Sequence, residues 1–197
     1  WCFITGNHDS PRLAPSLTDR ERRLAFAFLL TMPGAPFIYY GDEIGMDYRW
    51  LPSKEGGYAR TGSRTPMQWC SGKNLGFSES DAPYLPADDR EDAPTVESQE
   101  ADPGSMLHHV RKLITLRKSH ADLGNYSGFA VYSAEKGQRL FAYKRGNMLC
   151  VLNPGKVAAR LQLDEDYETV YTLGDCRLKG KQLQMPAQSF AVLKPTV

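Results

Sequence analysis

The fold is indicated most strongly by the stretch Phe3-Ile4-Thr5-Gly6-Asn7-His8-Asp9-Ser10-Pro11-Arg12. The apolar run from Trp1 to Ile4 is long enough to be the end of a buried strand. Gly6 ends that run, and Asn, His and Asp follow in direct succession. In α/β enzymes, catalytic residues lie at the C-terminal ends of buried strands. Polar residues such as Asn, His and Asp also form ordinary turns before a helix. The stretch therefore predicts an α/β fold and leaves two interpretations of His8 and Asp9 open, catalysis or a polar turn.

A helix and a second strand are predicted next. Thr18 and Glu21 have the spacing of a capping box, and an apolar run follows, so the pattern predicts a helix over residues 19–32. Residues 36–40 form a short apolar run that predicts a buried strand, and the polar residues 41–43 close it. Strand, helix and strand in this order are typical of βα units and imply a parallel sheet.

Residues 45–104 show no sustained periodicity. A loop of this length inside a compact domain is either functional or disordered, and the acidic, proline-rich residues 78–104 are typical of a flexible linker. Aromatic residues argue against a solvated tether, because rings along a loop can stack on sugar faces or pack in the interior. Both interpretations stay open for Trp50, Tyr58, Trp69, Phe77 and Tyr84.

The C-terminal part changes from helical to strand-like periodicity. Residues 106–119 predict an amphipathic helix, and three histidines in or after it are expected at the surface: His108, His109 and His120. After Gly124 the apolar period becomes two, with turns rich in Gly, Asn and Pro. This pattern predicts an antiparallel β-sandwich of six to eight strands, so the fold class is α/β plus all-β. The expected strands cover residues 129–132, 140–143, 148–152, 157–163, 169–173 and 190–193.

The composition of the 197 residues is that of a soluble globular protein, with 41% hydrophobic and 24% charged residues. A net charge of +1 gives no electrostatic case for binding nucleic acid or a membrane surface. The longest apolar stretch is too short to span a bilayer, and the absence of an initiator Met suggests a fragment that lacks its N-terminal portion. We expect the four separated cysteines to be free thiols in a reducing, cytoplasmic setting, with Cys2 and Cys150 acting as small hydrophobic residues.

Three stretches together resemble the α-amylase family of retaining α-glycosidases. Residues 6–9 resemble its fourth signature segment, at the end of barrel strand seven, and residues 34–46 resemble strand eight and its exit. Residues 63–69, Ser-Arg-Thr-Pro-Met-Gln-Trp, are similar to a segment of the oligo-1,6-glucosidase, α-glucosidase and trehalose-synthase branch. Residues 113–118 resemble the last barrel helix. The resemblance implies that residues 1–123 are the C-terminal part of a (β/α)₈ barrel and that residues 124–197 are a β-sandwich domain.

The same resemblance implies roles for individual residues near the C-terminal ends of the barrel strands. Asp9 matches the third catalytic carboxylate, which binds sugar hydroxyls and helps to distort the ring towards the transition state. His8 matches the histidine that bonds the 2-hydroxyl of the same sugar. Arg60, four residues before Arg64, matches the arginine that closes this subsite, and Asn7 is expected among the substrate-binding residues. The implied partner is a short α-glucan oligosaccharide.

The resemblance also implies that the catalytic set is incomplete. A retaining glycosidase needs a nucleophile and an acid/base carboxylate about 5 Å apart, and in this family both lie on earlier barrel strands. Asp42 and Glu43 match structural acids of strand eight and are not replacements. We therefore expect the chain alone to have no glycosidase activity. No cofactor is expected in this segment, whereas calcium is possible in a longer protein, since most of the family's calcium sites lie upstream.

Two departures leave the linkage specificity open, and three rival functions remain. Ser10 stands where oligo-1,6-glucosidases more often have Gln, and the insert between Met46 and Arg60 is shorter than in that branch. The leading interpretation is a hydrolase of short α-glucans. A transglycosylating isomerase of the trehalose-synthase kind, a non-catalytic relative, and a carbohydrate-binding module formed by residues 125–197 are the alternatives.

Overall fold

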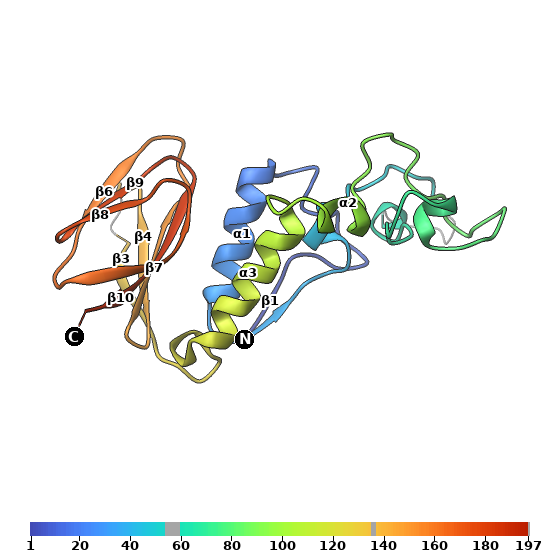
Figure 1. The fold of residues 1–197 in the computed structure, drawn as a ribbon. Coiled ribbons are helices and arrows are strands. Elements are labelled where there is room, and N and C mark those ends of the chain that lie inside the picture. The colour runs from blue at the N-terminus through green and yellow to red at the C-terminus, as the bar shows by residue number, and fades with distance from the viewer. Residues whose placement is uncertain (54–59, 135–136, 197) are drawn as a thin grey trace. The chain divides into compact units, whose positions relative to one another are not determined.

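The computed structural model describes residues 1–53, 60–134 and 137–196 (Figure 1). Its helices are α1 (Asp19–Thr31), α2 (Val96–Glu100) and α3 (Met106–Ser119), with 3₁₀ turns at Asp42–Ile44, Thr61–Ser63, Lys73–Gly76 and Ala121–Leu123. Its strands are β1 (Cys2–Ile4), β2 (Ala35–Phe37), β3 (Phe129–Ser133), β4 (Phe141–Arg145), β5 (Met148–Asn153), β6 (Ala159–Gln162), β7 (Tyr167–Leu173), β8 (Arg177–Lys179), β9 (Gln182–Met185) and β10 (Ser189–Pro195).

The chain forms two compact units. One comprises Trp1–Cys2, Arg23–Ala35 and Leu113–Val197, and the other comprises Phe3–Arg22 and Pro36–Lys112. The first unit holds the eight strands β3–β10, and the second holds the segments that follow β1 and β2. None of the helices in the described part of the chain is long and apolar enough to cross a membrane.

Helix α1 begins and ends where local sequence signals predict. The Glu21 carboxylate accepts hydrogen bonds from the Thr18 backbone N–H (2.9 Å) and hydroxyl (2.8 Å), and Thr18 Oγ1 accepts one from the Glu21 N–H at 3.3 Å. This is the predicted capping box. Pro33 and Gly34 follow the last turn, and Gly34 has a φ of +94°, which favours glycine. The prediction of this helix is confirmed, with its end one residue earlier than expected.

The first two strands form a parallel pair, but they are more exposed than the sequence predicts. Ala35 N donates to Trp1 O at 3.0 Å and Thr5 N donates to Phe37 O at 3.1 Å, so the partner residues advance in the same direction. The exposed fractions are 84% for Trp1 and 58% for Phe37, and Cys2 is also exposed. The prediction that these strands and Cys2 are buried is therefore wrong in this chain, because a two-stranded sheet leaves most of its side chains uncovered.

The first unit contains two antiparallel sheets. One has the strand order β3-β4-β5-β10-β7 and the other has the order β6-β9-β8 (Figure 1). A single core cluster draws side chains from both sheets, including Leu149, Val151, Leu183 and Leu193. The sequence predicts six of these eight strands and misses β8 and β9, which are three and four residues long. Runs that short carry little periodic signal.

Two arginines satisfy the carbonyls at the end of α1, where a helix leaves acceptors without intrahelical partners. Arg117 Nη1 donates to Leu30 O and Met32 O, both at 2.8 Å. The fully buried Arg145 donates to Thr31 O and, at 2.5 Å, to Gly124 O. Desolvation lowers the pKa of both arginines, and the proximity of Arg145 also lowers that of Arg117.

The second unit contains the long irregular segment that the sequence predicts. Its described residues between Gly45 and Gly104 form only 3₁₀ turns and the short helix α2. Trp50 and Tyr84 are exposed by 80% and 61%, whereas Tyr58 lies outside the described residues. Helix α3 has the predicted bounds.

One of the three histidines expected at the surface is not there. His109 is only 6% exposed, so its assignment to the surface is wrong. It lies on the same helical side as the buried Met106 and Leu113, since residues three or four apart on a helix are neighbours. The buried face of α3 therefore includes a polar residue and is wider than the stripe of apolar residues along the helix.

Candidate active site

The turn after β1 presents His8 and Asp9 to solvent. Asn7 Oδ1 accepts a hydrogen bond from Asp9 N at 2.8 Å, and Asn7 N donates to Ser10 Oγ at 3.3 Å. This is an Asx turn, in which an Asn side chain replaces a backbone acceptor. The sequence predicts that Asn7 binds substrate, but its side-chain oxygen here shapes the turn. The side chains of His8 and Asp9 are 65% and 53% exposed.

The Asp9 carboxylate contacts the side chains of one histidine and two arginines. Its Oδ2 lies 3.1 Å from His8 Nε2. Its Oδ1 lies 3.0 Å from Arg64 Nη2 and 3.5 Å from Arg60 Nη1. The structure thus brings together Asp9, His8 and Arg60 from segments more than 50 positions apart in the sequence. Because the carboxylate is half exposed, a ligand hydroxyl can reach it.

Arg64 is the site residue that sequence analysis missed. Besides its contact with Asp9, its Nε donates to His8 O at 2.9 Å, so one guanidinium holds both the backbone and the side chain of the turn. A planar guanidinium fork suits such a two-point contact, and a lysine does not. Arg64 lies within the family-like stretch of residues 63–69, but the resemblance assigns a role in the site only to Arg60, four positions earlier.

The turn that carries Arg60 and Arg64 is itself buried. Residues Thr61–Ser63 form a 3₁₀ turn, and Ser63 is 0% exposed. Ser63 O accepts a hydrogen bond from the Tyr39 hydroxyl at 3.0 Å. Burial raises the pKa of Tyr39 to about 12, with a further contribution from Tyr40, so this hydroxyl remains a donor at neutral pH.

The acids after β2 lie in a different environment from Asp9. Asp42 is 1% exposed and pairs with the Arg12 guanidinium, whose Nη1 lies 3.8 Å from Asp42 Oδ1. Burial raises the pKa of Asp42 despite the attraction of Arg12. Burial also raises the pKa of Glu43. The Asp42 carboxyl group is therefore out of reach of a ligand in solution, whereas Glu43 is partly buried.

Metal-binding clusters are absent from the part of the chain that the structure describes. No group of three or more His, Cys, Asp or Glu side chains there could hold a metal ion. The cysteines in it are free thiols, with Cys150 buried and Cys70 and Cys176 partly buried. The charged groups around Asp9 can form charge-assisted hydrogen bonds with hydroxyl groups of a ligand.

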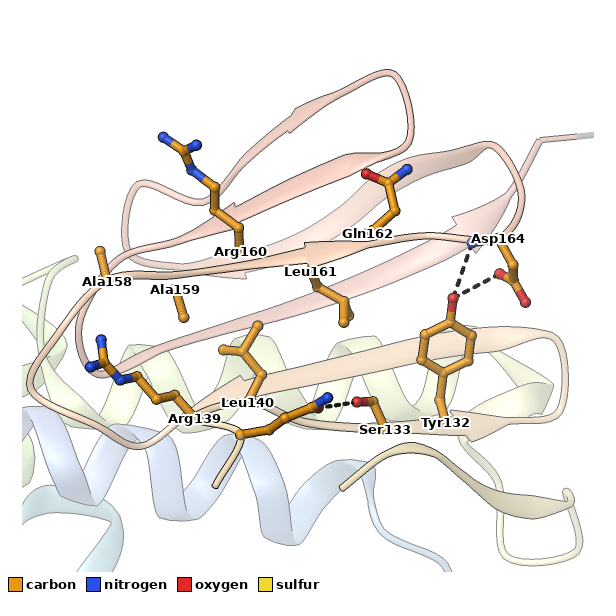
Figure 2. A pocket seen from close by; sticks show the side chains of 11 residues that line it. Tyr132, Ser133, Arg139, Leu140, Ala158, Ala159, Arg160, Leu161, Gln162 and Asp164 are labelled. Atoms are coloured by element: carbon orange, nitrogen blue, oxygen red, sulfur yellow. Dashed lines mark hydrogen bonds between the residues drawn. The ribbon is translucent and has the colours of Figure 1, made fainter. Parts of the chain in front are cut away.

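A cavity with a volume of about 670 Å³ lies in the first unit, the one that holds β3–β10 (Figure 2). Two pairs of its polar lining groups bond to each other: the Tyr132 hydroxyl donates to Asp164 Oδ1 at 2.8 Å, and the Ser133 hydroxyl donates to Gln138 Oε1 at 2.5 Å. Figure 2 shows Arg160 pointing to the opposite side of β6 from Leu161. Among the described residues that line this cavity, no carboxylate is paired with two arginines as Asp9 is.

A family model and several known proteins match most of this chain. Residues 1–125 match the family described as "Alpha amylase, catalytic domain". The chain is 36% identical over 201 aligned residues to a probable oligo-1,6-glucosidase 2 of Bacillus subtilis, covering 82% of this chain and 35% of that protein. It is 34% identical over 182 residues to a trehalose synthase/amylase of Mycobacterium tuberculosis, covering 82% of this chain and 28% of that protein.

A solved structure shows the same fold. The trehalulose synthase MutB from Pseudomonas mesoacidophila MX-45 superimposes with a TM-score of 0.82 at 21% identity, over 99% of this chain and 43% of that one. This chain thus spans about a third of the length of the curated relatives, which are 35% and 28% covered.

Proposed function

The chain belongs to the α-amylase family, and from this premise we propose that it is the C-terminal part of a retaining α-glycoside hydrolase that acts on short α-glucans. The observation that carries the proposal is the half-exposed Asp9 carboxylate between His8 and two arginines. Charged hydrogen bonds of this kind bind vicinal hydroxyls, and they contribute to rate when they strengthen in the transition state. In this proposal Asp9 is the transition-state-stabilising carboxylate, and His8 contacts the 2-hydroxyl.

The two arginines have complementary roles in this proposal. Arg64 fixes the orientation of Asp9, because it binds the His8 carbonyl and the carboxylate together. Arg60 makes a longer contact with the same carboxylate at 3.5 Å, and its side chain is 31% exposed. A sugar oxygen can therefore share the Arg60 guanidinium with Asp9. Asn7 contributes through the turn that it stabilises, and a direct contact with substrate would use its amide nitrogen.

The chain alone is proposed to be inactive. Hydrolysis with retention requires a nucleophile and an acid/base carboxylate about 5 Å apart on either side of the glycosidic bond. The buried Asp42 and the partly buried Glu43 do not supply this pair. We therefore assign both groups to other strands of a complete (β/α)₈ barrel, of which residues 1–123 form the last part. Residues 124–197 are proposed to form its C-terminal β-sandwich, a division supported by the parallel β1–β2 pair and the antiparallel β3–β10 sheets.

A transglycosylating isomerase is the second candidate, because this chain is also 34% identical to a trehalose synthase/amylase. Both candidates share the first half of the reaction, in which the glycosyl group leaves its first partner. They differ in the acceptor, which is water in the hydrolase and a sugar in the isomerase. The residues around Asp9 act before this branch point, so the choice depends on the acceptor side of the site.

Products formed from maltose by the full-length protein separate the candidates. Hydrolysis gives glucose as the main product, whereas isomerisation gives trehalose with little free glucose. The 197-residue chain is assayed beside the full-length protein, and we expect no turnover from it. Full activity in the 197-residue chain would refute the assignment of the two carboxylates to other strands. A full-length protein that is inert towards maltose and related α-glucans would favour the non-catalytic relative.

A further inference from the structure

Ser63 lies where the two halves of the proposed subsite meet. Its Oγ lies 2.8 Å from Arg60 O and 3.3 Å from His8 O, so its single O–H can donate to either carbonyl. The side chain is 0% exposed, and water cannot replace these bonds. One buried hydroxyl thus connects the segment that carries His8 to the turn that carries Arg60.

The carbonyl of Ser63 is held from the other side by Arg12. Arg12 Nη2 donates to Ser63 O at 3.2 Å, and Nη1 donates to Tyr40 O. The guanidinium also lies 4.9 Å and 4.6 Å from the ring centroids of Tyr39 and Tyr40. Arg12 is 1% exposed, so this rigid planar fork ties the exit of β1, the exit of β2 and the Ser63 turn together.

Ser63 is 0% exposed and Arg12 is 1% exposed, so a sugar cannot contact either side chain and both can act only through their neighbours. Ser63 precedes Arg64 directly and follows Arg60 by three positions. Any movement of this turn therefore changes the distances of both guanidinium groups from Asp9, now 3.5 Å and 3.0 Å. Displacing a catalytic group by about 1 Å can lower a rate by roughly 10²-fold.

We propose that Ser63, held by Arg12, is a positioning residue that sets where Arg60, Arg64 and His8 lie relative to Asp9. It thereby determines where His8 and Arg60 meet the sugar. The inference rests on the proposed glycosidase function, and it predicts a specific defect. Loss of the Ser63 hydroxyl removes none of the sugar-binding side chains, but it shifts their positions. The variant should therefore lose its discrimination for the 2-hydroxyl, which His8 contacts, as well as its rate.

The experiment compares Ser63→Ala with Ser189→Ala in the full-length protein. Ser189 is a matched control, because it is also 0% exposed and its hydroxyl donates to a backbone carbonyl, Pro186 O, at 2.7 Å. Ser189 belongs to the first unit, which holds β3–β10, whereas Ser63 belongs to the second. Each variant is assayed on p-nitrophenyl α-glucoside and on its 2-deoxy analogue, below its own melting temperature. The readout is the ratio of kcat/KM for the two substrates.

Ser63→Ala is expected to lower kcat/KM for the glucoside by at least about 10-fold and to reduce the ratio between the substrates. Ser189→Ala is expected to leave the ratio unchanged, even if its melting temperature falls. A second pair covers the case in which Ser63→Ala does not fold: Arg12→Lys should show the kinetic defect, and Arg145→Lys should not. Arg145 is the matched control, because it is a buried arginine that donates to backbone carbonyls in the other unit.

Two results would overturn the inference. One is an unchanged substrate ratio and rate in a folded Ser63→Ala, and the other is the same ratio change in Ser189→Ala. Failure of the proposed function itself looks different, because wild-type protein would then show no hydrolysis, or Asp9→Asn would retain it. If wild type is active and Asp9→Asn is inactive while Ser63→Ala behaves like wild type, the function stands and the positioning role is rejected.

Discussion

Replacement of Arg64 by Lys should lower activity far more than stability. Lysine keeps the positive charge near Asp9 but cannot donate to His8 O and to the carboxylate from one rigid fork. Between unit charges 3.0 Å apart, the distance from Arg64 Nη2 to Asp9 Oδ1, the Coulomb attraction is about 1.4 kcal/mol in water and about 5.5 kcal/mol at an effective dielectric constant of about 20. The side chains are 24% and 53% exposed, so the net value of such a pair is about 0.2–1 kcal/mol.

The stability cost of Arg64→Lys follows from these values. The lost hydrogen bond from Nε to His8 O, at 2.9 Å, adds about 1 kcal/mol, so the free energy of unfolding should fall by about 1–2 kcal/mol. Loss of one preorganised donor at a site of developing charge typically lowers kcat by about 10²–10³-fold. Since lysine retains part of the electrostatic effect, we expect kcat/KM to fall by about 10²-fold.

The assay measures thermal unfolding and hydrolysis of p-nitrophenyl α-glucoside for the full-length protein and the variant. Arg111→Lys is the control, because Arg111 also pairs with a carboxylate, Glu100, at 2.5 Å but lies in α3 and contacts neither His8 nor Asp9 in the described structure. It should retain wild-type kinetics. An Arg64→Lys variant with nearly wild-type kcat/KM would refute the reasoning. So would a variant whose loss of activity merely follows a large loss of folded protein.

Three further predictions concern the stability of the chain. Thr18→Ala removes the cap of α1 at an exposed position, and urea unfolding should show a loss of about 0.5–1 kcal/mol; no loss would mean that the cap does not contribute. Gly62→Ala places a Cβ 1.8 Å from Arg49 O, so we expect the free energy of unfolding to fall by about 1–3 kcal/mol. Gly128→Ala is the control and should be tolerated, because a Cβ there meets nothing within 4 Å. Equal effects of the two substitutions on urea unfolding would contradict the packing argument. Burial raises the pKa of Cys150 from 9.0 to about 12, so above about pH 9 the unfolded thiol loses its proton first, and stability should fall as pH rises. Urea unfolding between about pH 8 and pH 11 should show this fall, with about 1.4 kcal/mol per pH unit from the one thiol, and Cys150→Ala should reduce the slope; an unchanged slope would show that the thiol does not carry it.

Features that depend on neighbouring residues could be predicted from the sequence. The capping box between Thr18 and Glu21 and the bounds of α3 are set within a few positions, where the signals of helix start and periodicity act. The predicted cluster of His8 and Asp9 at a strand exit also lies within one short stretch. The family resemblance added Arg60, which no local rule would have placed near Asp9.

Features that depend on contacts across the chain could not be predicted in this way. Ser63 and His8 are 55 positions apart, and nothing in the pattern around Ser63 indicates that its hydroxyl reaches that carbonyl. The burial of Arg12 was missed for a related reason, since a charged residue after a turn is expected in solvent unless its partners are known. The exposure of Phe37 shows the converse, because an apolar run predicts burial only where other elements cover it.

The central claim is that Asp9 acts in the transition state of glycoside hydrolysis. It is tested most directly by comparing Asp9→Asn with wild type in the full-length protein, using p-nitrophenyl α-glucoside. Asp89→Asn is the control, because Asp89 is an 82% exposed carboxylate that also pairs with an arginine, Arg49, at 2.8 Å. The account predicts that kcat falls by orders of magnitude in Asp9→Asn alone while both variants stay folded. An active wild type with a nearly equally active Asp9→Asn would show that Asp9 is a turn residue and would contradict the account.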